Sequence, residues 1–332
     1  MTFEQIIESI KKGNYSPLYL FHGEESFFID QLVNEIQENL LTDMEKEFNQ
    51  NIFYGKDADP KNIVATCMQY PMMSEHRVVI LKEAQSLKNI DNLLPLVQNP
   101  PESTIFVVAY KDGKLNMNMK LGRAFKANGT VFLSDKIYES NIPKWIANYS
   151  KSLGISITTN ATILMTNLLS NDLSKIDNEL QKLKILYGKE TTIDIEHIKS
   201  NTSLNREYSM FELGKALSLR DFNTVYSVLN IFKSNPTAYP NVLIINNVFN
   251  QFVKTLILSE NKRLSDNELS RLLGVNPFFL KDFKIAAKAY SRTQLINIIS
   301  IIAEYDLKSK GIDNKSNSQV DLLVEMSIKI MN

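Results

Sequence analysis

The sequence has almost none of the residues that build disulfide frameworks or cysteine-ligated metal sites. Cys67 is its one cysteine, and the three histidines, His22, His76 and His197, lie far apart. A single cysteine cannot form an internal disulfide or a multi-cysteine zinc site, and it fits a reducing compartment. The histidines do not have the spacing of metal ligands. We therefore expect no metal and a cytoplasmic location.

An excess of charge of either sign is also missing. The 37 basic and 37 acidic residues give a formal net charge of zero, so the chain lacks the positive field that drives strong independent binding to nucleic acid. Long apolar runs are scarce as well, and the most apolar segment, 242–253, contains Asn246, Asn247, Asn250 and Gln251. That segment is expected to be a buried helix of a soluble protein and not a membrane-spanning helix.

What the sequence does contain is a set of short apolar runs. Its 332 residues, 44% of them hydrophobic, are enough for two or three domains. In the first 135 or so residues, apolar runs alternate with amphipathic segments, which predicts a doubly wound, open parallel sheet. The predicted strands are 18–21, 51–54, 78–81, 104–109 and 130–133, and the predicted helices are 27–41, 60–69, 87–98 and 115–126.

The strand signal almost disappears from about residue 141. Apolar residues then recur at helical spacing, and a short polar stretch, 201–205, reads as a linker. The predicted helices are 142–153, 161–169, 173–187, 208–219, 222–234, 239–259, 266–273, 277–287, 292–311 and 317–330. The sequence thus predicts an α/β domain at 1–140, a small helical domain at 141–205 and an all-helical domain at 206–332.

The turn after the first strand lies where a P-loop would bind phosphate. A P-loop needs glycines, a lysine for the phosphates and a serine or threonine for magnesium, but this turn reads Gly23, Glu24, Glu25 and Ser26. A carboxylate about 4 Å from a phosphate costs about 4 kcal/mol at intermediate dielectric. This degenerate phosphate turn is not expected to bind nucleotide. No nucleophile elbow is present either, so we expect neither a catalytic site nor a cofactor.

Two methionines occupy a polar segment just before the strand at 78–81. Met72 and Met73 follow Pro71 and precede Ser74 and Glu75. Flexible apolar side chains of this kind suit an adaptable contact with the hydrophobic pocket of another protein. The alternative is that both methionines close the core at the end of the preceding helix, because apolar residues are more often core than contact.

Several segments together resemble the delta subunit of the bacterial DNA polymerase III clamp loader. They are 17–25, 70–81, 171–173, 178–183, 272–278 and 305–311, and their order spans nearly the whole chain. The resemblance implies an AAA+ like domain, a small helical lid domain and a helical collar domain. It also implies a component of the DNA polymerase III holoenzyme, a DNA-directed DNA polymerase, that does not itself hydrolyse ATP.

In that family the first domain binds the sliding clamp (beta) and helps to open it for loading onto primed DNA. The resemblance assigns the clamp contact to Pro71, Met72 and Met73, where methionine replaces the aromatic or leucine side chains common in the family. The implied partners are the motor subunits (tau/gamma) and delta-prime in a heteropentamer, with primed DNA met only within the complex. The motor and delta-prime subunits carry a cysteine-rich zinc module and a Ser-Arg-Cys motif, and this sequence has neither.

Two other interpretations remain open from the sequence. An atypical P-loop NTPase with an unusual phosphate turn would be stabilised by nucleotide in isolation. A stand-alone helical adaptor would bind no clamp and assemble with no motor subunit.

Overall fold

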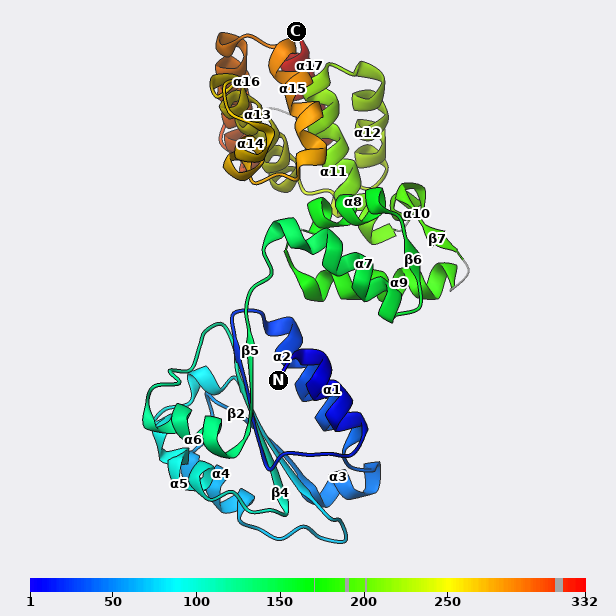
Figure 1. The fold of residues 1–332 in the computed structure, drawn as a ribbon. Coiled ribbons are helices and arrows are strands. Elements are labelled where there is room, and N and C mark those ends of the chain that lie inside the picture. The colour runs from blue at the N-terminus through cyan, green and yellow to red at the C-terminus, as the bar shows by residue number, and fades with distance from the viewer. Residues whose placement is uncertain (170, 189–190, 201, 314–318) are drawn as a thin grey trace. The chain divides into compact units, whose positions relative to one another are not determined.

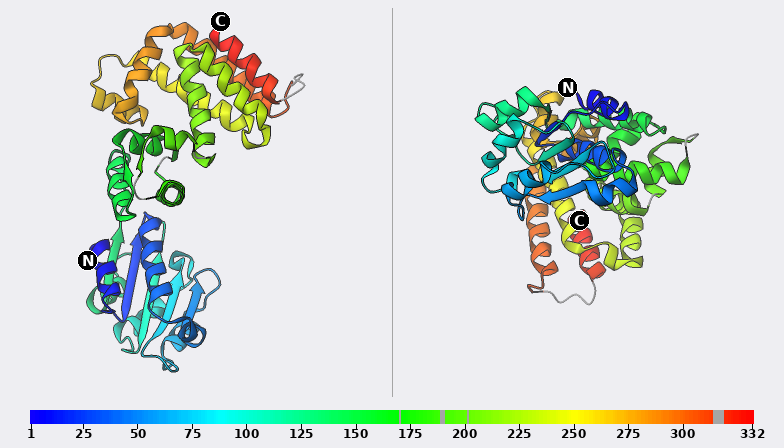
Figure 2. Two further views of the ribbon diagram at one scale, coloured as in Figure 1. Left: turned by 90° about the vertical axis from the view of Figure 1, so that its right-hand side faces the viewer. Right: turned by 90° about the horizontal axis from the view of Figure 1, so that it is seen from below.

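The chain forms two compact units in the computed structural model, residues 1–137 and 138–332 (Figures 1 and 2). The structure describes residues 1–169, 171–188, 191–200, 202–313 and 319–332. The boundary near residue 137 lies close to the predicted end of the α/β domain. A further division of the second unit at residue 205 stays a prediction.

A five-stranded parallel sheet forms the centre of the first unit. Its order is β2-β3-β4-β1-β5, and every neighbouring pair is parallel. The strands are β1 (Leu18–Gly23), β2 (Gln50–Tyr54), β3 (Arg77–Lys82), β4 (Thr104–Tyr110) and β5 (Thr130–Ser134). All five predicted strands are confirmed, and with them a parallel-sheet α/β domain followed by helices.

Helices cover both faces of this sheet (Figure 1). Successive side chains of a strand point to opposite faces. Leu18 and Leu20 therefore pack in one core with helices α4 (Pro60–Cys67), α5 (Leu94–Gln98) and α6 (Lys120–Asn128). Tyr19 and Phe21 pack in the other core with α1 (Phe3–Lys11) and α2 (Ser26–Asn39). A strand buried on both faces reads as a continuous apolar run, which is why the strands were visible in the sequence.

The helices of the first unit differ from the prediction mainly in four places. The sequence analysis missed α1 and α3 (Asp43–Asn49), although each begins with a capping box. The predicted helix at 87–98 is confirmed only in its last part, α5, because the structure has two 3₁₀ turns, Ala84–Ser86 and Ile90–Leu93, before it. Asn89 has a left-handed backbone with φ 55°, which interrupts a right-handed helix. The predicted helix at 115–126 begins only at Lys120.

The second unit is helical apart from one small sheet. Two strands pair in parallel, β6 (Ser156–Ile157) and β7 (Thr192–Ile193), and neither was predicted. The helices are α7 (Ile142–Ser152), α8 (Thr159–Leu169), α9 (Leu173–Tyr187), α10 (Ile195–Ser200), α11 (Thr202–Leu219), α12 (Phe222–Ser234), α13 (Asn241–Glu260), α14 (Asp266–Leu273), α15 (Leu280–Ala289), α16 (Arg292–Ser309) and α17 (Gln319–Met331), with 3₁₀ turns at Glu139–Asn141, Pro236–Ala238 and Pro277–Phe279.

The predicted linker at 201–205 is wrong for its described residues. Residues 202–205 form the first turn of α11, and Leu204 is completely buried. The polar residues around Leu204 suggested a loop because the apolar spacing of a helix is not visible over so short a stretch. Asn201 lies outside the described residues, as do residues 317 and 318 of the helix predicted at 317–330.

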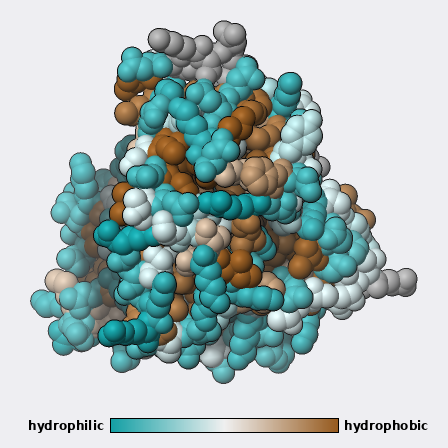
Figure 3. Space-filling model, turned by 90° about the horizontal axis from the view of Figure 1, so that it is seen from above, coloured by the Kyte–Doolittle hydropathy of each residue, from teal (hydrophilic) through white to brown (hydrophobic). Residues whose placement is uncertain are grey.

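Helix α13 lies in the core of the second unit. It is long and apolar enough to cross a membrane by length and composition, but Ile244, Val248 and Phe252 are buried in the helical core. Its buried Gln251 donates to Ser218 Oγ at 3.1 Å, so a polar side chain is satisfied inside the unit. These contacts make α13 a core helix. The space-filling view shows polar side chains interspersed with apolar patches on the surface (Figure 3).

Candidate functional site

The two methionines singled out in the sequence are exposed. They lie on the connection between α4 and β3, residues 68–76, which we call the Met loop. The exposed fraction is 57% for Met72 and 101% for Met73, and Met68 and Tyr70 of the same loop are exposed as well. The interpretation of Met72 and Met73 as core residues is therefore wrong. Several large apolar side chains on one connection are typical of a surface that contacts another protein.

Asn49, the last residue of α3, holds this loop from one side. The amide N–H of Met72 donates to Asn49 Oδ1 at 2.7 Å, and Asn49 Nδ2 donates to the Met72 carbonyl at 2.9 Å. Asn49 is completely buried, so both of its amide groups need partners inside the protein. The backbone of Met72 supplies them, 23 positions further along the chain.

Arg77, the first residue of β3, holds the same loop from the other side. Its Nε donates to the Gln69 carbonyl at 3.2 Å and its Nη2 to the Tyr70 carbonyl at 3.3 Å, while Nη1 donates to Asn51 Oδ1 at 2.9 Å. Only 5% of Arg77 is exposed. A buried guanidinium with three accepting oxygens fixes the geometry of the groups around it.

The backbone of the loop is bent sharply at Met73. Its φ is 51°, in the left-handed region where a residue other than glycine costs roughly 1–2 kcal/mol. Ser74 follows directly, and its hydroxyl bonds the backbone of His76. A hydrogen bond from Ser74 also lowers the pKa of the Glu45 carboxyl on α3, after the larger contributions from Thr42. The hydrogen bonds that tie the backbone of the loop to α3 are those of Asn49.

The degenerate phosphate turn and the Met loop lie at opposite ends of the parallel strands. The turn follows the carboxyl end of β1, whereas the Met loop precedes the amino end of β3, and the strands are parallel. A strand of six residues spans about 20 Å at about 3.3 Å per residue. Ligands of open parallel sheets bind at the carboxyl ends of the strands. The Met loop is therefore not at the carboxyl ends of the strands, where a small ligand would be expected.

Backbone groups close the phosphate turn. The Gly23 carbonyl accepts from the Gly113 N–H at 3.2 Å, the Glu25 N–H donates to the Ser134 carbonyl at 3.2 Å, and Ser134 Oγ donates to the Glu25 carbonyl at 2.6 Å. These contacts join the turn to β5 and to the segment after β4. A Cβ at Gly23 would lie 2.6 Å from the Ser134 carbonyl carbon, so no open loop surrounds this position.

The side chains of the turn are engaged too. The Glu25 carboxylate accepts from the Phe27 N–H at 3.3 Å and caps helix α2, at the helix end where an anion would otherwise bind. Ser26 Oγ donates to the Asp112 carboxylate at 3.3 Å. Glu24 is exposed. The hydroxyl at the position of the magnesium ligand of a P-loop is thus bonded to a carboxylate.

Buried His22 supports the same closed segment. Its Nδ1 accepts from the Leu115 N–H at 3.1 Å. Burial is the main cause that lowers the pKa of His22, and the charge of Lys114 lowers it further, while Asp135 opposes them. The neutral imidazole acts here as a hydrogen-bond acceptor for the backbone.

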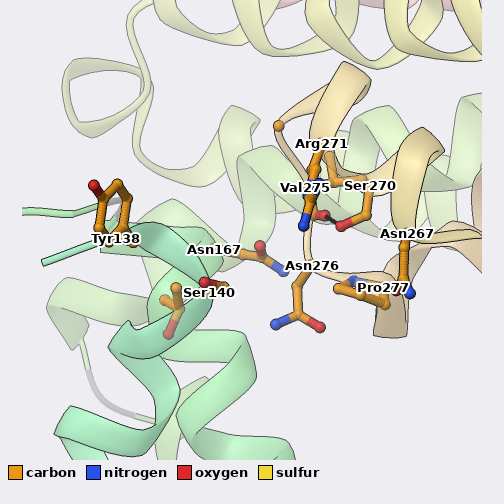
Figure 4. Close-up of a pocket in the computed structure, with 11 residues that line it drawn as sticks. Tyr138, Ser140, Asn167, Asn267, Ser270, Arg271, Val275, Asn276 and Pro277 are labelled. Carbon is orange, nitrogen blue, oxygen red and sulfur yellow. Dashed lines mark hydrogen bonds between the residues drawn. The ribbon is translucent and has the colours of Figure 1, made fainter.

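One further cavity lies within the second unit, between α8 and the turn from α14 to the 3₁₀ turn at Pro277 (Figure 4). It has a volume of about 770 Å³. Its polar groups include Asn167, Arg271 and Asn276, and Ser270 Oγ donates to the Val275 carbonyl. The described lining residues include no carboxylate, histidine or cysteine, and the described part of the chain holds no cluster of metal-ligating side chains. This cavity lacks the acid–base groups of an active site.

Comparison with known proteins connects these features to one family. The family described as DNA polymerase III, delta subunit, matches residues 19–133, a range that contains the phosphate turn and the Met loop. The DNA polymerase III subunit delta of Bacillus subtilis strain 168 is 25% identical over 97% of this chain and 96% of that protein. This chain is similar to DNA polymerase III delta subunits.

A solved structure shares the fold of this chain. The Bacillus subtilis DNA clamp loader delta protein matches with a TM-score of 0.68 and 23% identity, over 99% of each chain. The resemblance stated from the sequence is confirmed by the similarity to the Bacillus subtilis subunit over 97% of the chain, and the solved structure shows the same fold.

The sequence analysis found Pro71, Met72 and Met73 but missed the residues that hold them. Arg77 had a visible signal, because a charged residue that begins an otherwise apolar strand either projects into solvent or is buried with acceptors. Asn49 had none, because its partner is the backbone of a residue 23 positions away.

Proposed function

We propose that this chain acts as the delta subunit of a DNA polymerase III clamp loader. In this role it binds the ring-shaped sliding clamp and helps to open it for loading onto primed DNA, without hydrolysing ATP itself. The observation that carries the proposal is the exposed pair Met72 and Met73 on a loop tied down by buried side chains. The similarity to a curated delta subunit over 97% of the chain supports the choice of partner.

The Met pair supplies the binding energy in this proposal. Burying two methionine side chains contributes about 3–6 kcal/mol before the costs of ordering and association. Most of both side chains is available for burial, since 57% of Met72 and all of Met73 is exposed. Such a contact biases the clamp toward an open ring only if its pocket differs between the closed and open ring, because a ligand shifts an equilibrium only by its difference in affinity.

The phosphate turn has no part in this mechanism. Gly23 and Glu25 are bonded through their backbones to Gly113 and Ser134, and the Glu25 carboxylate occupies the amino end of α2. ATP acts on neighbouring subunits instead. The proposed assembly is a heteropentamer with motor subunits (tau/gamma) and delta-prime in the cytoplasm, joined through the C-terminal helices. This chain contacts primed DNA only within that complex, because a net charge of zero gives it little attraction of its own for phosphates.

The test is a titration of the purified chain against the sliding clamp of the same organism, without nucleotide. The double variant Met72→Ala/Met73→Ala is expected to bind at least 100-fold more weakly, which corresponds to about 2.8 kcal/mol. Met119→Ala is the matched control, because Met119 is 55% exposed on the same unit. It directly precedes α6, after the carboxyl end of β4 and away from the Met loop. Its affinity should equal that of the parent.

The outcomes separate the proposal from its rivals. Equal affinity of the double variant and the parent would remove the Met pair from the contact. No binding by a well-folded parent would favour a stand-alone adaptor. A rise in the melting temperature with ATP and magnesium would favour an atypical NTPase, since a ligand that binds only the folded state stabilises it.

A further inference from the structure

Asn49 is a buried residue whose side-chain amide oxygen and amide nitrogen both bond the backbone of Met72. Nδ2 donates to the Met72 carbonyl at 2.9 Å and to the Glu45 carbonyl at 3.1 Å, and Oδ1 accepts from the Met72 N–H at 2.7 Å. The pair of bonds to Met72 has the pattern of two residues paired across antiparallel strands. It fixes the peptide groups on both sides of the Met72 side chain.

We infer that Asn49 is a positioning residue for the clamp contact and holds Met72 and Met73 in their binding conformation before the clamp arrives. This inference rests on the proposed function. It adds to the contact a residue on a different element, α3, that touches no partner itself because it is completely buried.

The need for such a residue follows from the exposure of Met73. Its left-handed backbone, with φ 51°, carries strain that persists only when the surroundings determine it. The Met73 side chain is fully exposed and so has no packing that would hold the bend. The bend is held by its neighbours instead, Met72 through Asn49 and Ser74 through its hydroxyl contacts.

Asn49 and Arg77 act on different parts of the loop. Arg77 bonds the carbonyls of Gln69 and Tyr70, before Pro71, while Asn49 bonds Met72 after it. Loss of the Asn49 bonds releases the Met pair but leaves the start of the loop attached to β3. The conformational entropy of the released residues must then be lost on binding, which weakens affinity without removal of any contact.

The test compares clamp affinities of four proteins without nucleotide: the parent, Asn49→Ala, Met72→Ala/Met73→Ala, and the triple variant. Asn49→Ala is expected to weaken binding about 10- to 100-fold. The triple variant should bind no more weakly than the double variant, because a loop without its methionines has nothing left to position. In the free Asn49→Ala protein, amide hydrogen exchange should accelerate at residues 72–74 and stay slow in β3.

Two further variants guard against a general loss of structure. Asn128→Ala is the matched control, because Asn128 also donates from its side-chain amide to two backbone carbonyls, those of Val97 and Gln98, outside the Met loop. It should bind like the parent. Asn49→Asp keeps the size and the acceptor of asparagine but places a carboxylate oxygen against the Met72 carbonyl. If Asn49→Ala does not fold, Asn49→Asp is expected to show the same 10- to 100-fold loss with protected β3 amides.

The results distinguish failure of the inference from failure of the proposed function. Parent-like binding by the Met double variant refutes the proposed function. Loss of binding in that variant, together with parent-like binding by Asn49→Ala, refutes only the positioning role. The positioning role is also refuted if Asn49→Ala lowers clamp affinity by the same factor in the Met double variant as in the parent. Asn49 would then affect binding through the stability of the fold and not through the Met pair.

Discussion

Replacement of Gly23 by alanine tests whether the phosphate turn is as tightly closed as the structure describes. Gly23 has φ 144°, and an added Cβ would lie 2.6 Å from the carbonyl carbon and 2.8 Å from the nitrogen of Ser134. Both neighbours are backbone atoms of β5, which pairs with β1 at this position. Relief of the overlap therefore requires the two strands to separate.

The expected cost follows from two contributions. The unfavourable backbone conformation costs about 1–3 kcal/mol, and overpacking typically costs another 1–3 kcal/mol. Gly13→Ala is the matched control, because Gly13 lies in the same unit with φ 76° and nothing within 4 Å of an added Cβ. It should carry only the conformational cost of about 1–2 kcal/mol. Alanine stiffens the unfolded chain equally in both variants, so this effect cancels in the comparison.

The assay is urea unfolding of the α/β unit, followed by labelling of its only thiol. Cys67 is buried in that unit, whereas Trp145, the only tryptophan, lies on α7 and reports the helical unit by fluorescence. The two probes keep the two unfolding transitions apart. A loss of stability in Gly23→Ala no larger than in Gly13→Ala would refute the closed turn and reopen the case for a ligand there.

Two further predictions concern titratable groups of the same unit. Burial lowers the pKa of His22, so the stability it contributes is complete above the ordinary pKa of 6.5 and is lost as the pH falls toward the lower folded value. Between pH 7.5 and pH 5 the urea midpoint should fall less in His22→Asn, whose Oδ1 can still accept from the Leu115 N–H, than in the parent. An equal fall of the midpoint in both proteins would contradict this. Burial raises the pKa of Cys67 to about 12, so the thiol stays protonated at pH 8. A disulfide reagent should label it only after unfolding, and rapid labelling of the native protein would show that the site is open.

The sheet was predictable because burial on both faces leaves a direct record in the sequence. The run from Val78 to Leu81 has no polar residue, and it lies in β3 between two layers of helices. Helix α3 was not predictable from apolar periodicity, since only one of its seven residues, the polar Asn49, is buried. Its signal was local, the capping box of Thr42 and Glu45, which sequence patterning alone did not single out.

The candidate site was predictable only in its composition. The missing lysine of the phosphate turn and the pair Met72 and Met73 can be read from the sequence. Apart from the Ser134 hydroxyl, the closure of the turn by Gly113 and Ser134 depends on backbone contacts over about a hundred residues. These contacts involve groups that every residue carries, so they leave no trace in residue identity.

The exposure of Met72 and Met73 gives the Met loop a chemical sensitivity that leucine or phenylalanine would not have. Peroxide converts an accessible thioether to a polar, chiral sulfoxide, and methionine sulfoxide reductases reverse the change. Met73, fully exposed, should be oxidised before buried Met165 or Met326, which peptide mass spectrometry after mild peroxide treatment can measure. Under the proposed function, such a surface would connect clamp binding to oxidative stress through a reversible modification of the proposed contact.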